Sequence, residues 1–152
     1  MGDAKAKVGT QAPPFEIEGT GGKTYSLDEY DHGVILAFYP GDFTAVCTKQ
    51  FCSYRDDGDR LESLGLPMLG ISPQSVDSHE RFSRENNLTI PLGADTDKAV
   101  ADAYGVLGPG GFVRRAIFVI DSDHVIRYRH VALFGLGFQD VSDLEKAVEG
   151  IT

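Results

Sequence analysis

The sequence VILAFYP, residues 34–40, is a continuous apolar run of branched and aromatic residues. A strand with one exposed face alternates apolar and polar residues, whereas an unbroken apolar run fits a strand that is covered on both faces. Pro40 has no backbone N–H to donate, so we expect the strand to end there. The chain must then supply helices for both sides of a sheet, which predicts an α/β fold.

Strand and helix patterns alternate along the rest of the chain. Residues 14–19 alternate apolar and polar positions and lead into a glycine-rich turn, which predicts an N-terminal β-hairpin. Further strands are expected at 66–72, 91–95, 115–121 and 124–131, and helices at 26–30, 44–64, 75–87, 98–105 and 142–150, with Ser75 and Ser142 as N-caps. We therefore expect one domain, residues 1–152, with a central mixed β-sheet flanked by helices and compatible with a thioredoxin-like core.

The charge of the chain narrows the range of partners. The formal net charge is −9 at pH 7 and the basic residues are scattered, which argues against binding to nucleic acid or to an anionic membrane surface. No apolar run is long enough to span a bilayer, and the first residues lack the apolar segment of a signal peptide. We expect a soluble protein that stays in the cytoplasm.

The chain has only two cysteines, and both lie just after the buried strand. Cys47 falls in the first turn of the helix expected from Thr44, at the carboxyl end of strand 34–40. Open backbone N–H groups and the positive end of the helix dipole favour a thiolate at such a position. Cys47 is therefore a candidate nucleophile. The alternative is a buried, inert cysteine on the inner face of the helix.

The spacing of the two cysteines separates them on a helix. Cys52 lies five positions after Cys47, which places the two Cα atoms about 8–9 Å apart if both are helical. A disulfide needs Cα atoms within about 7 Å, so the pair could bond only after local unwinding. The spacing is not the CxxC of a thioredoxin-type reductant, and two sulfurs without nearby His or Cys do not complete a zinc site. We expect no metal and no cofactor.

Other polar residues near this segment have two interpretations. Thr44 could simply be a helix N-cap and Pro40 a strand stop, or they could contact a molecule bound at Cys47. The four histidines, at positions 32, 79, 124 and 130, are expected to have solvated or capping roles.

Residues 39–56, YPGDFTAVCTKQFCSYRD, closely resemble the peroxiredoxin active-site pattern Pro-x-x-x-Thr-x-x-Cys, matched by Pro40, Thr44 and Cys47. The second cysteine after four intervening residues is similar to the peroxiredoxin Q or bacterioferritin comigratory protein subgroup. The likeness extends to the opening, middle helix and late hairpin of the chain. There are departures: Gln50 stands where many peroxiredoxins have Glu, and Phe51 replaces a small residue.

The resemblance implies a thiol peroxidase of the atypical two-cysteine type, active in antioxidant defence. Cys47 would attack hydrogen peroxide or an organic hydroperoxide and become a sulfenic acid. Cys52 would then resolve it as an intramolecular disulfide, which a thioredoxin-like or glutaredoxin-like dithiol would reduce.

The resemblance also implies the remaining site residues. The family's site arginine matches Arg115, with Arg114 as a neighbour that could share its role. Arg115 and Thr44 would donate hydrogen bonds to the oxygen that leaves, and Arg115 would favour the thiolate. Pro40 would keep water away from the sulfur.

Two other functions stay open at this point. One is a thioredoxin-fold redox sensor or disulfide reductase, and the other is a non-enzymatic interaction domain with an inert Cys47. The resemblance favours a monomer or a weak homodimer, for which Phe43 and Phe112 are candidate contact residues.

Overall fold

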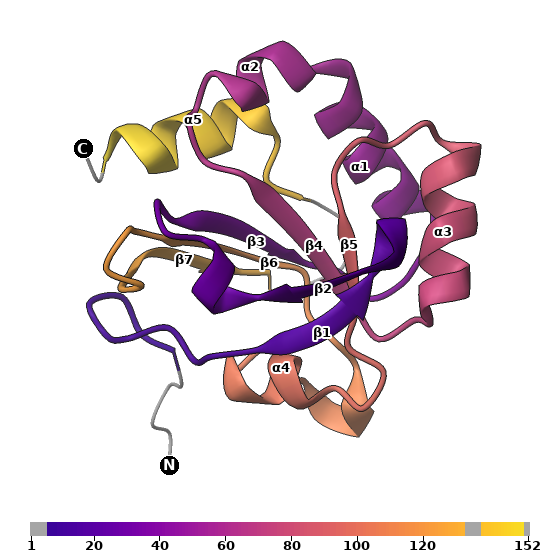
Figure 1. The fold of residues 1–152 in the computed structure, drawn as a ribbon, viewed down its shortest axis with the longest axis horizontal. Helices are drawn as coiled ribbons and strands as arrows, with labels where there is room; N and C mark the ends of the chain where they lie inside the picture. The colour runs from indigo at the N-terminus through magenta and orange to yellow at the C-terminus, as the bar shows by residue number, and fades with distance from the viewer. Residues whose placement is uncertain (1–5, 133–137, 151–152) are drawn as a thin grey trace.

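A computed structural model describes residues 6–132 and 138–150 of the chain (Figure 1). Within these residues, one mixed sheet of seven strands has the order β2-β1-β5-β4-β3-β6-β7. The strands are β1 (Glu16–Gly19), β2 (Lys23–Ser26), β3 (Val34–Phe38), β4 (Met68–Ser72), β5 (Leu92–Ala94), β6 (Ala116–Ile120) and β7 (Ile126–Val131). Because β1 and β2 pair antiparallel, the predicted N-terminal hairpin is confirmed.

Strand β3 lies inside the sheet, between β4 and β6. It runs parallel to β4 and antiparallel to β6, and all of its residues are buried. Side chains of a strand point alternately to its two faces. Val34, Leu36 and Phe38 accordingly belong to one hydrophobic core, and Ile35 and Ala37 belong to the other. The unbroken apolar run is thus explained by burial on both faces, as predicted.

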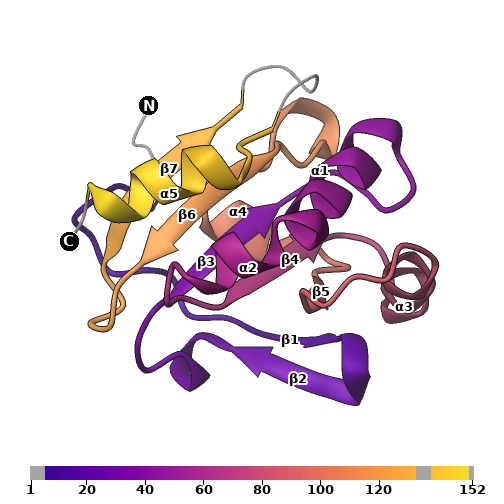
Figure 2. The same ribbon diagram turned by 90° about the horizontal axis from the view of Figure 1, so that it is seen from above.

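Helices cover both faces of the sheet (Figure 2). Side chains of α1, α2, α3 and α5 pack into the core of Ile35 and Ala37, whereas those of α4 pack into the core on the other face. The helices are α1 (Ala45–Asp56), α2 (Gly58–Glu62), α3 (Val76–Glu85), α4 (Ala99–Ala103) and α5 (Val141–Glu149), with 3₁₀ turns η1 (Thr20–Gly22), η2 (Leu27–Glu29) and η3 (Pro109–Gly111). No helix in the described part of the chain is long and apolar enough to cross a membrane.

The helices expected over 75–87 and 98–105 are shorter in the structure, and the other two long helices differ from the prediction in ways that their backbone explains. The single helix expected over 44–64 is two helices, because Asp57 has φ −98° and ψ 28°, outside helical values, and Gly58 follows it. Helix α5 begins one residue earlier than expected, since its N-cap is Asp140 and not Ser142. The Asp140 carboxylate accepts from the N–H of Asp143, and the Asp143 side chain accepts in return from the N–H of Asp140.

Candidate active site

Cys47 lies in the first turn of α1, the helix that follows strand β3. Strand β3 ends at Phe38, a short loop follows, and α1 begins at Ala45 with Thr44 as its N-cap. The Thr44 hydroxyl accepts a hydrogen bond from the backbone N–H of Cys47 at 3.4 Å. The thiol is fully buried, in the first turn of the helix, where open N–H groups and the helix dipole attract negative charge.

Arg115 brings a cation to this sulfur. It directly precedes β6, whose first residue Ala116 pairs with Phe38 at the end of β3. This register places the guanidinium beside the start of α1, where Nη1 lies 3.1 Å from Cys47 Sγ. Arg115 is only 5% exposed, so this charge-assisted contact is little screened by water.

Gln50 fixes the orientation of Arg115. Its Oε1 accepts from Arg115 Nη1 at 2.7 Å, and its Nε2 donates to the Tyr54 hydroxyl at 2.9 Å. Tyr54 donates in turn to the backbone carbonyl of Gln139 at 2.6 Å. Burial raises the pKa of Tyr54, which keeps the hydroxyl protonated as a donor. Tyr54 was not expected in the site, although its spacing of four from Gln50 places both residues on one helix face.

The other predicted residues occupy different positions. Thr44 is exposed, and its N-cap role is confirmed because its hydroxyl accepts from the backbone N–H of Cys47. The same hydroxyl donates to the carbonyl of Gly41 at 3.2 Å. Pro40 is half-buried at the start of the loop. The Arg114 side chain lies beside Gly108, and successive side chains of an extended segment point to opposite faces, so Arg114 and Arg115 point to different sides. The structure therefore brings Arg115, and not Arg114, to Cys47.

Cys52 lies further along α1 and is half-buried. Its thiol donates to Asn86 Oδ1, at the end of α3, with a distance of 3.5 Å. Arg55 strengthens this junction by donating to the backbone carbonyl of Asn86 at 2.6 Å. Both cysteines are free thiols, and both are helical, so the predicted separation of about 8–9 Å between their Cα atoms applies. They cannot bond without unwinding α1.

A buried polar cluster behind the loop was not anticipated. Asp42 and His79 have fully buried side chains, with His79 Nδ1 2.7 Å from Asp42 Oδ2. Tyr39 donates to Asp42 Oδ1 at 2.7 Å, and Ser78 donates to Asp42 Oδ2 at 2.8 Å. The expectation that His79 is solvated or capping is therefore wrong. No pattern in the sequence marks this histidine, because it follows Asp77 and Ser78 in a helix with mostly polar residues.

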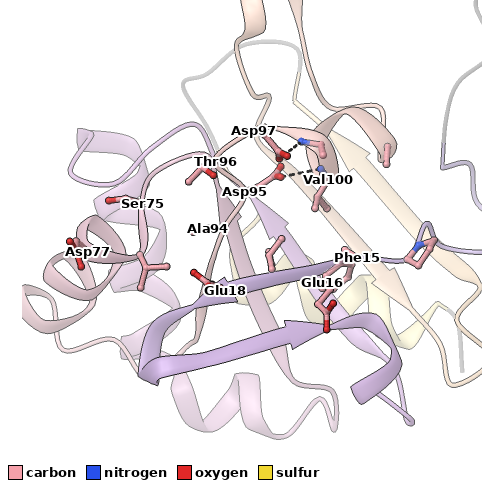
Figure 3. A pocket seen from close by; sticks show the side chains of 15 residues that line it. Phe15, Glu16, Glu18, Ser75, Asp77, Ala94, Asp95, Thr96, Asp97 and Val100 are labelled. Atoms are coloured by element: carbon pink, nitrogen blue, oxygen red, sulfur yellow. Dashed lines mark hydrogen bonds between the residues drawn. The ribbon is translucent and has the colours of Figure 1, made fainter.

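A hollow of about 660 Å³ lies elsewhere, between β1, the start of α3 and α4 (Figure 3). Its lining includes the acidic residues Glu16, Glu18, Asp77, Asp95 and Asp97 but none of the residues around Cys47. The Asp95 carboxylate already accepts from the N–H groups of Val100 and Ala101, and burial raises its pKa. Among the described residues, no group of three or more His, Cys, Asp or Glu is arranged to hold a metal ion.

A buried thiol at the start of a helix, paired with a guanidinium at the start of the neighbouring strand β6, defines a thiol-based redox protein. Residues 8–129 match the model of the AhpC/TSA family, and the chain belongs to this family. It is similar to a protein named putative peroxiredoxin bcp from Coxiella burnetii, with 38% identity over 128 residues, which cover 79% of this chain and 85% of the relative. It is also similar to a chloroplastic peroxiredoxin Q from Sedum lineare, with 32% identity over 127 residues, covering 82% of this chain and 68% of that one.

Solved structures agree with this assignment. The crystal structure of peroxidoxin BcpB from Mycobacterium tuberculosis superposes with a TM-score of 0.82 and 28% identity, covering 95% of this chain and 96% of that one. The predicted thioredoxin-like fold and the resemblance to the peroxiredoxin Q and Bcp group are confirmed.

Proposed function

We propose that the chain is a thiol-dependent peroxidase whose nucleophile is Cys47. The observation that carries the proposal is the contact of 3.1 Å between Arg115 Nη1 and Cys47 Sγ in a buried site at the start of a helix. Family membership supports it, since the relatives above are named peroxiredoxins.

In the proposed reaction, the Cys47 thiolate attacks the terminal oxygen of a hydroperoxide. The S–O bond forms as the O–O bond breaks, which leaves a sulfenic acid and an alkoxide or hydroxide that takes a proton to become alcohol or water. Negative charge develops on the leaving oxygen, so donors must be in place before the reaction. Arg115 is suited to this role because its Nε has no acceptor among the described residues. Thr44 and the half-buried Pro40 complete the proposed site.

We propose Cys52 as the resolving residue. After α1 opens, its thiolate attacks the sulfenic sulfur, expels hydroxide and forms the disulfide. A thioredoxin-like or glutaredoxin-like dithiol then reduces this disulfide by exchange. The free state of both thiols in the structure fits the reduced starting form, in a reducing compartment that we propose to be the cytoplasm.

The test is a quenched-flow reaction of reduced protein with one equivalent of hydrogen peroxide, followed by a count of free thiols. Wild type is expected to lose both thiols rapidly. Cys52→Ser is expected to lose only Cys47 and to hold a sulfenic acid that dimedone traps, while Cys47→Ser stays reduced. Oxidation of wild type no faster than that of free cysteine would contradict the proposal.

We further propose that residues 1–152 act as one domain, as a monomer or a weak homodimer. The described strands form a single sheet, and the exposed aromatic residues Phe43 and Phe112 are 44% and 53% exposed. Sedimentation velocity across a range of protein concentrations tests this, and a stable oligomer at low micromolar concentration would contradict it.

A further inference from the structure

The structure assigns a positioning role to Asp42, together with His79 and Tyr39: these residues hold the loop before α1 in a strained conformation that sets the place of Cys47. This inference deepens the proposed peroxidase function and rests on it for the effect on rate. The loop comprises residues 41–44, and we call the group formed by Asp42, His79, Tyr39, Ser78 and Gln74 the Asp42 cluster.

Hydrogen-bond donors converge on the Asp42 carboxylate. Tyr39 donates to one oxygen, and Ser78 and His79 Nδ1 approach the other. Burial and the adjacent Asp42 raise the pKa of Tyr39, so its hydroxyl stays protonated. A buried carboxylate without such partners would be strongly unfavourable. The side chain of Asp42 is therefore fixed to α3 and to the residue that follows β3.

His79 is fixed from its other side as well. Its Nε2 lies 3.0 Å from the carbonyl oxygen of Gly93 in β5. A carbonyl oxygen only accepts, so Nε2 donates to Gly93. The histidine thus ties the loop to the sheet through two directed hydrogen bonds.

The backbone of Asp42 is held too, because its N–H donates to Gln74 Oε1. This contact lies directly beside Gly41, whose added Cβ would meet the same Gln74 oxygen at 2.6 Å. Gly41 in turn offers its carbonyl to the Thr44 hydroxyl. The Asp42 cluster is therefore connected to the N-cap of α1 within two residues.

Phe43, between Asp42 and Thr44, has a strained backbone that the rest of the loop must stabilise. Phe43 has φ 64°, in the left-handed region that a bulky aromatic residue rarely adopts. Such a conformation persists only where the surroundings determine it. The Phe43 ring packs on Phe82 at 5.3 Å and lies 5.4 Å below the guanidinium of Arg81, both in α3. Asp42 and Phe43 thus anchor the loop to the same helix.

The experiment measures whether the effect of Asp42 depends on the strain at Phe43. Asp42→Asn replaces one acceptor oxygen by an N–H₂ group, which then faces a hydrogen-bond donor. The loop is therefore expected to leave its strained conformation. Peroxide oxidation of Cys47 should slow about 10²-fold, as for a misplacement near 1 Å. In a Phe43→Gly background, where the left-handed conformation is not strained, the same substitution should cost less than tenfold.

Two further variants keep the test decisive. Gln74→Ala leaves no buried charge unpaired and is expected to act in the same direction as Asp42→Asn, again less strongly beside Phe43→Gly. Asn87→Gly relieves an exposed left-handed residue, φ 52°, outside the loop and serves as the control without effect. The inference would be overturned if each substitution slowed peroxide oxidation by the same factor in the wild-type and in the Phe43→Gly background. It would also be overturned if neither substitution slowed oxidation in either background.

A second readout separates this inference from the proposed function. Amide hydrogen exchange over residues 41–47 and alkylation of Cys47 by iodoacetamide need no peroxide, and urea midpoints report global stability. Faster exchange confined to this segment in Asp42→Asn supports the positioning role even if wild type proves unreactive toward peroxide. Unchanged local exchange in a folded variant would overturn the role even if the peroxidase reaction is confirmed.

Discussion

At the scale of residues, Arg115 serves two acceptors with a single nitrogen, Cys47 Sγ and Gln50 Oε1. Lysine keeps the charge but cannot reproduce the planar fork that Gln50 orients. We expect Arg115→Lys to lower the second-order rate constant of peroxide oxidation by about 10²–10³-fold, the usual effect of losing one preorganised donor. The rate is measured by quenched flow.

The matched control is Arg114→Lys, because the Arg114 side chain lies beside Gly108 and follows the opposite face from Arg115. Its rate constant should stay within about twofold of wild type, as for a surface substitution. Equal losses in both variants would show that the two arginines share the role.

Residues that belong to a recognisable sequence pattern could be predicted, whereas residues that are buried only by tertiary contacts could not. Cys47 and Thr44 follow from the start of a helix after a buried strand, and the resemblance supplied Arg115. The burial of Asp42 and His79 could not be predicted, because a short polar residue in a loop and a histidine among polar neighbours usually face solvent. Only the packing of α3 against the loop buries them.

At the scale of elements, Cys52 lies at the junction between α1 and α3. Asn86 accepts from the Cys52 thiol and donates from Nδ2 to the carbonyl of Phe82 at 3.0 Å. Asn86→Ala removes both contacts and should favour opening of this end of α1 by about 1 kcal/mol, which makes disulfide formation about fivefold faster. The measurement is the rate of the second thiol loss after a peroxide pulse.

The neighbouring variant Asn87→Gly keeps the left-handed backbone after α3 and should leave this rate unchanged. A slower second phase in Asn86→Ala would mean that the contact with Asn86 assists resolution instead of delaying it.

The N-terminus of α5 gives a stability prediction. Asp140 caps the helix and forms a capping box with Asp143, whereas Ser142 only accepts from Arg60 Nη2 at the surface. Asp140→Ala should lower the free energy of unfolding by about 1 kcal/mol in urea titrations, and Ser142→Ala by less than about 0.5 kcal/mol. A larger loss of stability in Ser142→Ala than in Asp140→Ala would show that Ser142 is the cap.

Helix positions were predictable from the sequence, but their ends were less so. Gly58 marked a weak point within residues 44–64, yet only the backbone of Asp57 shows that the helix breaks there. Two acidic residues three apart, Asp140 and Asp143, compete with Ser142 as a start signal, and the packing of α5 on the sheet decides between them.

At the scale of the whole molecule, we expect the half-buried Tyr30 and the buried Tyr104 to make the free energy of unfolding depend on pH in the alkaline range. Burial, with Glu29 nearby, raises the pKa of Tyr30 to about 12, and burial raises the pKa of Tyr104 above its ordinary value of 10.0. The folded state then keeps protons that the unfolded state releases. This stabilisation is fully present below about pH 10 and is lost as pH rises through the folded-state pKa values.

Urea midpoints measured between pH 8 and pH 11.5 should therefore fall at the alkaline end. Tyr104→Phe removes the hydroxyl that donates to the carbonyl of Pro13, so it should be less stable at pH 8 but lose stability less steeply above pH 10. Parallel curves for the variant and wild type would refute the assignment to this tyrosine.

The overall architecture was predictable because the apolar run at residues 34–40 permits few alternatives. A strand buried on both faces requires a helix layer on each side, and the alternating patterns supplied both layers. Strand order was not predictable, because the pairing of β1 with β5 rests on one pair of residues, Gly19 and Gly93. Glycine permits this approach, since a Cβ at Gly19 would lie 2.4 Å from the Leu92 carbonyl oxygen.

The packing of Phe51 is expected to limit the rate at which α1 opens in the proposed peroxidase. Its ring is fully buried, with ring centroids 4.6 Å from Tyr39 and 5.4 Å from Tyr54, and it must leave this packing when α1 opens toward Cys52. In the proposed mechanism, opening would have a rate that does not depend on peroxide, whereas a second peroxide molecule would oxidise the sulfenic acid to sulfinic acid at a rate proportional to its concentration. The ratio of the two rate constants is a concentration, and we expect the packing of Phe51 to set this peroxide concentration, above which irreversible oxidation outruns disulfide formation.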